Sequence, residues 1–233
     1  MRIAAIQHHL RADAAEDARA LADAASLAAA RGASLIVCPQ VASLRSDGGE
    51  GAALLGELLE DVQALCLVPD VDPASRGLAL VVTLPGVEEA PDGLGIAGLV
   101  IGDACIDPAE IAGLCAQRPS IAVLSPCSQT DLQAEAMLEY AIALSDSLSG
   151  VVIIAECSGA EPLEPGHGGS AIVVLGEVLA EALAADDVLV ADVAVPFPEP
   201  KPREPLPPVP PLLAQRFQHH RGVLALEHGP DAS

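Results

Sequence analysis

The sequence is poor in aromatic residues. It contains no tryptophan, one tyrosine and two phenylalanines, although hydrophobic residues make up 51% of its 233 positions. The core must therefore be built from alanine, valine, leucine and isoleucine, without the large rings that often line ligand pockets. A chain of this length can form one large α/β domain with a core of its own.

Positive charge is also scarce. The sequence has 11 Lys and Arg against 33 Asp and Glu, a formal net charge of −22, and Lys201 is its sole lysine. Binding to nucleic acid requires clustered basic residues, and the sequence has no such cluster. The charge therefore argues against nucleic acid and anionic membrane surfaces as partners, and it is typical of an acidic, well-solvated protein.

Long apolar runs and paired metal-ligand motifs are absent as well. No run approaches the roughly 18–20 residues of a membrane span. The polar residues at positions 7–9 interrupt the first apolar stretch too early for a signal peptide, so we expect a cytoplasmic protein. The six cysteines show no CxxC pair and no metal-ligand spacing, which predicts reduced, buried thiols and neither a metal nor another cofactor.

Strand-like and helix-like segments alternate along the first 193 residues. We predict strands over residues 2–7, 33–38, 78–84, 96–101, 120–124, 151–155 and 187–193, and helices over residues 14–30, 50–65, 108–116 and 132–148. The opening β-α-β unit predicts a parallel pair of strands with a right-handed crossover. The pattern indicates a layered α/β fold with one continuous core, and it leaves open whether there are three layers or four.

Residues 166–182 carry the most informative local pattern. A glycine-rich turn precedes the apolar strand Ala171–Leu175, and a turn at Gly176–Glu177 leads into a second strand that begins at Val178. This pattern is typical of a β-hairpin with little freedom in its register.

The chain changes character at Pro196. Nine of the sixteen residues from Pro196 to Pro211 are proline, which predicts an extended arm because proline fixes φ and removes a hydrogen-bond donor. We therefore divide the chain into a domain over residues 1–195 and an arm with a C-terminal tail over residues 196–233. The arm either reaches across to a partner or is a plain disordered tail, and residues 212–226 can fold back as a short ordered end.

Six segments resemble, in order, the nitrilase superfamily of Cys-dependent carbon–nitrogen hydrolases. They lie at residues 1–7 with 32–39, 98–110, 121–126, 137–144, 150–155 and 166–182. The resemblance implies an α-β-β-α sandwich. It also implies a homodimer or higher oligomer in which helices of two protomers pack together and the C-terminal tail crosses to the partner.

The same resemblance implies a chemistry that this chain lacks. Members of the family use a Cys nucleophile, a Glu that accepts and returns the proton, and a Lys that stabilises the developing negative charge. The family's Glu follows a proline at a strand end, where this chain has Gln40, and the family's Cys falls at Gly102. An amide cannot act as a general base, and glycine has no nucleophile. We interpret Gln40 and Gly102 as degenerate site positions; the alternative for Gln40 is an ordinary polar residue.

The missing groups have few replacements. Lys201 lies beyond both positions, and Arg76, one of the two arginines between them, is interpreted as a surface turn residue. Cys105 is a candidate displaced nucleophile, although Asp103 and Asp107 flank it and negative charge opposes thiolate formation. The alternative for Cys105 is a bystander thiol.

Other polar residues point to no site. We interpret His8, His9 and His167 as surface or capped groups. Ser170 lacks the G-x-S-x-G elbow of a serine hydrolase. The glycine pattern at residues 93–98 precedes a strand rather than following one, which does not fit phosphate binding.

Three functions remain. The first is a catalytically degenerate protein that binds a small molecule or a partner and assembles with itself. The second is a divergent amide or nitrile hydrolase that uses a displaced Cys. The third is a regulatory subunit of an active relative. The sequence favours the first.

Overall fold

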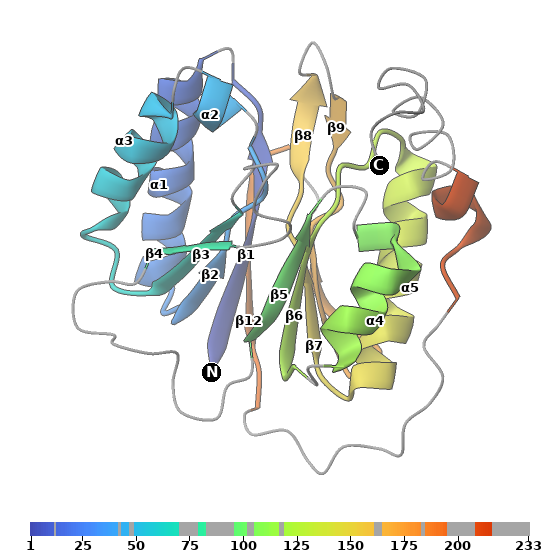
Figure 1. Cartoon of the computed structure of the whole chain (residues 1–233). Coiled ribbons are helices and arrows are strands. Elements are labelled where there is room, and N and C mark those ends of the chain that lie inside the picture. Colours follow the sequence, from blue (N-terminus) through green and yellow to red (C-terminus); the bar gives the residue numbers. More distant parts are fainter. Residues whose placement is uncertain are drawn as a thin grey trace.

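Two β-sheets stack face to face, and helices cover the outer face of each sheet (Figure 1). The structure is a computed structural model. It describes residues 1–11, 13–41, 43–46, 49–69, 79–82, 96–101, 105–116, 119–160, 165–182, 185–194 and 208–215. Of the sequence-predicted features, Gly102, Arg76, Lys201 and most of the Pro-rich arm lie outside these residues.

The first sheet gathers strands from both ends of the domain. Its order is β4-β3-β2-β1-β8-β9, with β12 paired to β1, and its strands are β1 (Arg2–His9), β2 (Leu35–Val37), β3 (Leu65–Pro69), β4 (Ala79–Val82), β8 (Cys157–Ala160), β9 (Pro165–His167) and β12 (Asp187–Asp192). The strands β1, β2 and β3 are parallel, as the opening β-α-β unit predicted, whereas β12 runs antiparallel to β1.

The second sheet has five strands. Its order is β11-β10-β7-β6-β5, and its strands are β5 (Ile96–Ile101), β6 (Ile121–Ser125), β7 (Val151–Ile154), β10 (Ala171–Val174) and β11 (Glu177–Glu181). Strands β5, β6 and β7 are parallel, and the predicted hairpin is the antiparallel pair β10–β11. Its turn lies at Leu175–Gly176, one residue earlier than expected, where both residues have positive φ as a two-residue hairpin turn of type I′ requires.

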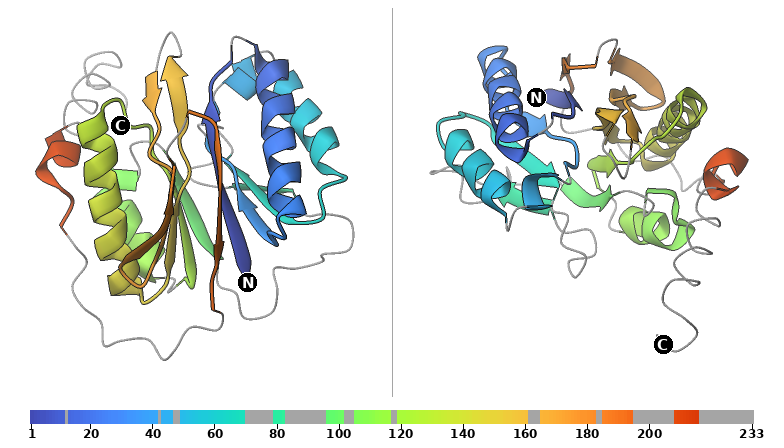
Figure 2. Two further views of the ribbon diagram at one scale, coloured as in Figure 1. Left: turned by 180° about the vertical axis from the view of Figure 1, so that it is seen from behind. Right: turned by 90° about the horizontal axis from the view of Figure 1, so that it is seen from above.

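Five helices in the described part of the chain flank the two sheets. The helices α1 (Ala14–Ala30), α2 (Ser43–Ser46) and α3 (Glu50–Leu59) lie on the first sheet, and α4 (Pro108–Ala116) and α5 (Asp131–Leu148) lie on the second (Figure 2). Helix α1 begins where the Asp13 carboxylate accepts a hydrogen bond from the Ala15 amide. The predicted helix over residues 50–65 was wrong beyond Leu59, because β3 begins at Leu65 after a short turn. The sequence analysis also missed α2, β8 and β9.

Three aliphatic layers hold the stack together. One lies between the first sheet and α1 and α3, with Ile6, Leu21 and Leu59 fully buried. A second lies between the sheets, where Ile3, Val123 and Ile153 meet. The third lies between the second sheet and α4 and α5, and it includes Tyr140. This four-layer α-β-β-α sandwich confirms the sequence-predicted fold class.

Near the C-terminus, the chain packs against the third layer, between the second sheet and helices α4 and α5. Residues 211–215 form a helical turn that begins at Pro211, a residue that suits the first position of a helix. Leu213 is buried against the α4–α5 layer, and Val209 packs beside it. None of the helices in the described ranges is long and apolar enough to cross a membrane.

Candidate functional site

The carboxyl ends of parallel strands from both sheets meet at one edge of the sandwich. Strands β1 and β2 of the first sheet and β6 and β7 of the second all end there, at the top of Figure 1. In layered α/β proteins this edge is the usual place for a binding or catalytic site. The polar groups at the edge therefore define the candidate site.

Gln40 lies at this edge and joins the two sheets. It follows β2, and its backbone amide donates a hydrogen bond to the Ser125 hydroxyl at the end of β6, with an N–O distance of 2.8 Å. The buried Ser125 hydroxyl in turn donates to the Ala155 carbonyl after β7, at 3.0 Å. One serine side chain therefore fixes the backbone of Gln40 over the second sheet. The Gln40 side chain is partly exposed and makes no hydrogen bond to any described residue.

Cys157, which the sequence analysis did not single out, is the thiol beside Gln40. Its sulfur lies 3.2 Å from the Gln40 carbonyl oxygen and donates a hydrogen bond to it. Only the protonated thiol can make this bond, so the contact opposes formation of the thiolate, which is the nucleophilic form. Cys157 is half-buried at the start of β8.

A buried carboxyl group lies next to this thiol. Glu156 is 1% exposed, and its side chain accepts a hydrogen bond from the Ser128 hydroxyl at 2.6 Å. The Glu156 amide donates to the Ser170 hydroxyl at 2.9 Å. Sequence analysis missed Glu156, although a charged residue directly after the apolar run at residues 151–155 was the available signal.

Gln7 completes the polar layer beneath the edge. Its side-chain oxygen accepts hydrogen bonds from the amides of Gly169 and Ser170, at 2.8 and 2.9 Å. The Gln7 side chain is 5% exposed, so these bonds form in a place that water hardly reaches. Ser170 thus lies between Gln7 and Glu156, and among the described residues its hydroxyl hydrogen-bonds with the backbone of Glu156 rather than with a histidine.

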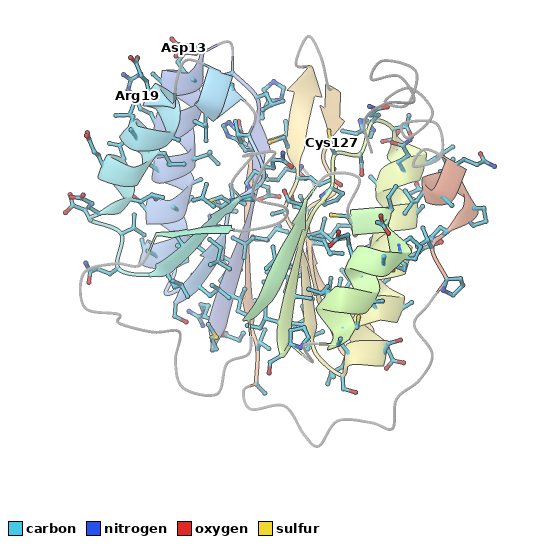
Figure 3. All side chains as sticks on the ribbon, viewed as in Figure 1. Asp13, Arg19 and Cys127 are labelled. Carbon is cyan, nitrogen blue, oxygen red and sulfur yellow. The ribbon has the colours of Figure 1, made fainter. Side chains whose placement is uncertain are left out.

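Cys105, the sequence candidate for a displaced nucleophile, lies elsewhere. It has no exposed surface and packs in the layer under α4 and α5 with Tyr140. Cys38 and Cys66 lie in the first sheet, where burial raises the pKa of the Cys38 thiol far above its ordinary value and that of Cys66 to about 11. These two thiols are therefore poor nucleophiles near neutral pH. Cys127, half-buried, follows β6 between the two halves of the sandwich (Figure 3).

Three of the described arginines form ion pairs or hydrogen bonds on the first sheet, away from Gln40. Arg2 pairs with Asp192 and Arg11 with Asp186 on the first sheet, and Arg31 donates to the Val188 carbonyl. Arg19 lies on the outer side of α1, well apart from Cys127 (Figure 3).

His8 is buried, whereas the sequence analysis interpreted it as a surface or capped group. It is 2% exposed, and its Nε2 lies 2.6 Å from Oδ1 of Asp17, a fully buried carboxylate of α1. Asp17 also accepts hydrogen bonds from the Arg11 amide at 2.8 Å and the Ser43 hydroxyl at 2.6 Å. This network joins β1, α1 and α2, and it anchors α2 three residues after Gln40.

Among the described residues, no group of three or more His, Cys, Asp or Glu side chains could hold a metal ion. The His167 side chain forms an ion pair with Asp131, and both side chains reach the solvent.

Comparison with known proteins identifies solved structures with a similar overall fold. No family model matches the sequence, and no curated protein matches it. The amidase from Nesterenkonia sp. AN1 is similar in structure, with a TM-score of 0.66 at 18% sequence identity, over 98% of this chain and 100% of that one. A variant of the amidase in complex with butyramide is similar to the same degree, with a TM-score of 0.66 at 19% identity, over 97% and 96% of the two chains.

One of the similar structures, a variant of the Nesterenkonia amidase, is an amidase from the nitrilase superfamily. The likeness covers almost the whole of both chains, as the sequence resemblance predicted. The chain therefore has the fold of the nitrilase superfamily.

Proposed function

We propose that this protein is a nitrilase-superfamily member that no longer hydrolyses carbon–nitrogen bonds. In this proposal it is a binding or scaffold protein that assembles with itself. The observation that supports the proposal is the position of Gln40 at the strand edge, where an amide stands in place of the family's general base and the Cys157 thiol donates a hydrogen bond to the Gln40 backbone carbonyl.

The proton acceptor is the first missing function. A carboxylate at the position of Gln40 would accept a proton from the attacking thiol, and general-base catalysis contributes about 10²–10⁴-fold to a rate. The Gln40 amide cannot do this near neutral pH. Glu156, the buried carboxyl group next to Cys157 in the sequence, accepts a hydrogen bond from the Ser128 hydroxyl.

The nucleophile is the second missing function. The position that the family resemblance assigns to Cys is Gly102 in this sequence. In the Nesterenkonia amidase, a variant with glutamine in place of a glutamate still shows acrylamide added to the active-site cysteine, and a second such structure shows covalent addition from fluoroacetamide. Loss of the carboxylate alone thus leaves a reactive thiol in that enzyme, whereas this chain has lost the thiol position as well.

Covalent labelling tests the proposal directly. The purified protein would be incubated with acrylamide or fluoroacetamide and followed by intact-mass spectrometry, with an active nitrilase-fold amidase as the positive control. We expect slow labelling spread over exposed thiols and no ammonia release from butyramide. Rapid, stoichiometric labelling of one cysteine, abolished by Cys157→Ala or by Cys105→Ala, would show a rebuilt active site and contradict the proposal.

Self-assembly requires its own measurement. Light scattering coupled to size-exclusion chromatography gives the mass of the pure protein, and we expect a dimer or larger oligomer. A monomer in isolation that forms a complex only with a second nitrilase-fold chain would instead favour the regulatory-subunit function.

A further inference from the structure

A separate cavity lies at the same edge, on the side of α5 and β8. Its volume is about 440 Å³, within the range of about 300–1,000 Å³ that is usual for small-molecule sites. It does not include Gln40 or Cys157. The described residues that line it are Gln7, Asp131, Ala134, Glu135, Leu138, Ser158, His167, Gly168, Gly169, Glu181, Ala182 and Ala185.

Carboxylates from two elements that are distant in sequence line the cavity. Asp131 and Glu135 come from the first two turns of α5, and Glu181 comes from the end of β11. No lysine or arginine is among the described lining residues. His167 is the one basic group, and it is paired with Asp131. The net charge of −22 adds a long-range field of the same sign.

The walls combine this charge with apolar surface and a fixed polar floor. Ala134, Leu138 and Ala182 supply apolar wall. At the floor, the Ser158 side chain is 6% exposed and donates to the Ala185 carbonyl at 2.9 Å, which ties β8 to the turn before β12. The floor is therefore formed before any ligand arrives, and this lowers the entropic cost of binding.

A glycine turn closes the cavity against α5. Gly168 has a φ of +87°, and a Cβ built there would lie 2.9 Å from the Gln7 side-chain oxygen. A Cβ built at Gly169 would lie 3.0 Å from the Ala134 Cβ. The turn thus approaches α5 and β1 as closely as a backbone can, and it gives the cavity a rigid wall.

We infer that this cavity binds a small organic cation, an ammonium group on a short alkyl chain. The carboxylates of Glu135 and Glu181 contact the ammonium group, and the alanine and leucine side chains contact the methylene groups. The positive end of the α5 dipole opposes a cation, but it acts only within the first turn, and Thr130 already caps the Gln133 amide there. This inference goes beyond the proposed loss of hydrolysis, because the cavity shares no residue with the Gln40–Cys157 contact.

Calorimetry with chemically matched probes tests the inference. Diaminobutane and butylamine are the cationic probes, and butanol and butyrate are the neutral and anionic controls of the same chain length. We expect the amines to bind, butanol and butyrate not to bind, and amine binding to weaken as salt is added. Equal binding of butanol and butylamine would overturn the inference, because it would show that charge plays no part.

Paired variants locate the site. Glu135→Gln with Glu181→Gln removes two cavity carboxylates from exposed positions, and Glu139→Gln with Glu177→Gln makes the same change on the same two elements outside the cavity. Exposed ion pairs each contribute up to about fivefold in affinity, so we expect the first pair to weaken amine binding by about five- to thirtyfold and the second to leave it nearly unchanged. Equal losses in both pairs, or none in the first, would overturn the inference. Both outcomes are independent of the labelling test for hydrolysis.

Discussion

Replacement of Asp17 should show how strongly the stability of the fold depends on one buried carboxylate. Asp17 is fully buried, and its Oδ1 accepts from His8 and from the Arg11 amide while its Oδ2 accepts from Ser43. Asp17→Asn keeps the shape, because the oxygen can still serve His8 and the Arg11 amide and the new amide group can donate to the serine hydroxyl. It removes the charge, which strengthens such bonds about twofold.

The two substitutions at this site should differ in a predictable way. We expect Asp17→Asn to lower the free energy of unfolding by about 2 kcal/mol, since the three charge-assisted hydrogen bonds become neutral ones. Asp17→Ala removes the acceptor of the buried His8 ring and of the Arg11 amide, and we expect a loss of about 3–5 kcal/mol. Urea unfolding near neutral pH measures both, with Glu16→Gln as the control because Glu16 is an exposed carboxylate on the same turn of α1.

The same carboxylate makes stability depend on pH. Burial raises the pKa of Asp17, but the hydrogen bonds from His8, Ser43 and the Arg11 amide outweigh it, so the pKa lies below its ordinary value. A group with a depressed folded-state pKa stabilises the fold above its unfolded value of about 4, and this stability is lost as the pH falls through the folded value. The difference between the wild type and Asp17→Asn should therefore shrink below about pH 4. A difference that is absent at neutral pH, or that grows on acidification, would refute the reasoning.

Four further substitutions test the packing around the edge, in α3 and at the C-terminal turn. Gly168→Ala should destabilise the protein by about 1–3 kcal/mol, because φ is +87° and the added Cβ would lie 2.9 Å from a side-chain oxygen. Gly56→Ala, with open space in α3, should instead stabilise it by about 0.5–1 kcal/mol; thermal unfolding compares the two. Ser125→Ala should cost about 1–3 kcal/mol in urea unfolding, because the buried hydroxyl supports the Gln40 amide. Leu213→Ala should expose the 208–215 segment to limited proteolysis at an otherwise little-changed melting temperature, whereas unchanged proteolysis would show that Leu213 does not anchor it.

The elements that were predicted correctly have strong local signals. Helix α1 was predicted at residues 14–30 because this stretch is rich in alanine and leucine and is followed by Gly32. The strand β3 was missed because Leu65–Pro69 is buried throughout and shows no alternation that could separate it from the end of a helix. The strands β8 and β9 are short and not apolar, so they form through pairing with the end of β1 and with each other rather than through propensity.

The candidate site was only partly predictable for a related reason. Gln40 was found because Pro39 and the preceding strand resemble a family pattern. The neighbours of Gln40 depend on long-range pairing: Ser125 is 85 positions away and Cys157 is 117 positions away. The buried pair of His8 and Asp17 likewise depends on how α1 packs on β1, and no spacing rule predicts it from the sequence.

Under the proposed loss of hydrolysis, the buried polar groups explain how the fold can persist without catalysis. These groups satisfy backbone donors and acceptors: Gln7 accepts from two amides, Ser125 bonds to Gln40 and Ala155, and Ser170 accepts from Glu156. Because an unsatisfied buried amide costs about 1–3 kcal/mol, folding alone selects for these side chains. A base, a cation and a thiolate satisfy no backbone group, so their loss removes chemistry at little cost in stability. An intact polar layer beneath the edge is therefore a sign of the fold, and it carries no information about activity, which depends only on the groups that reach the cleft.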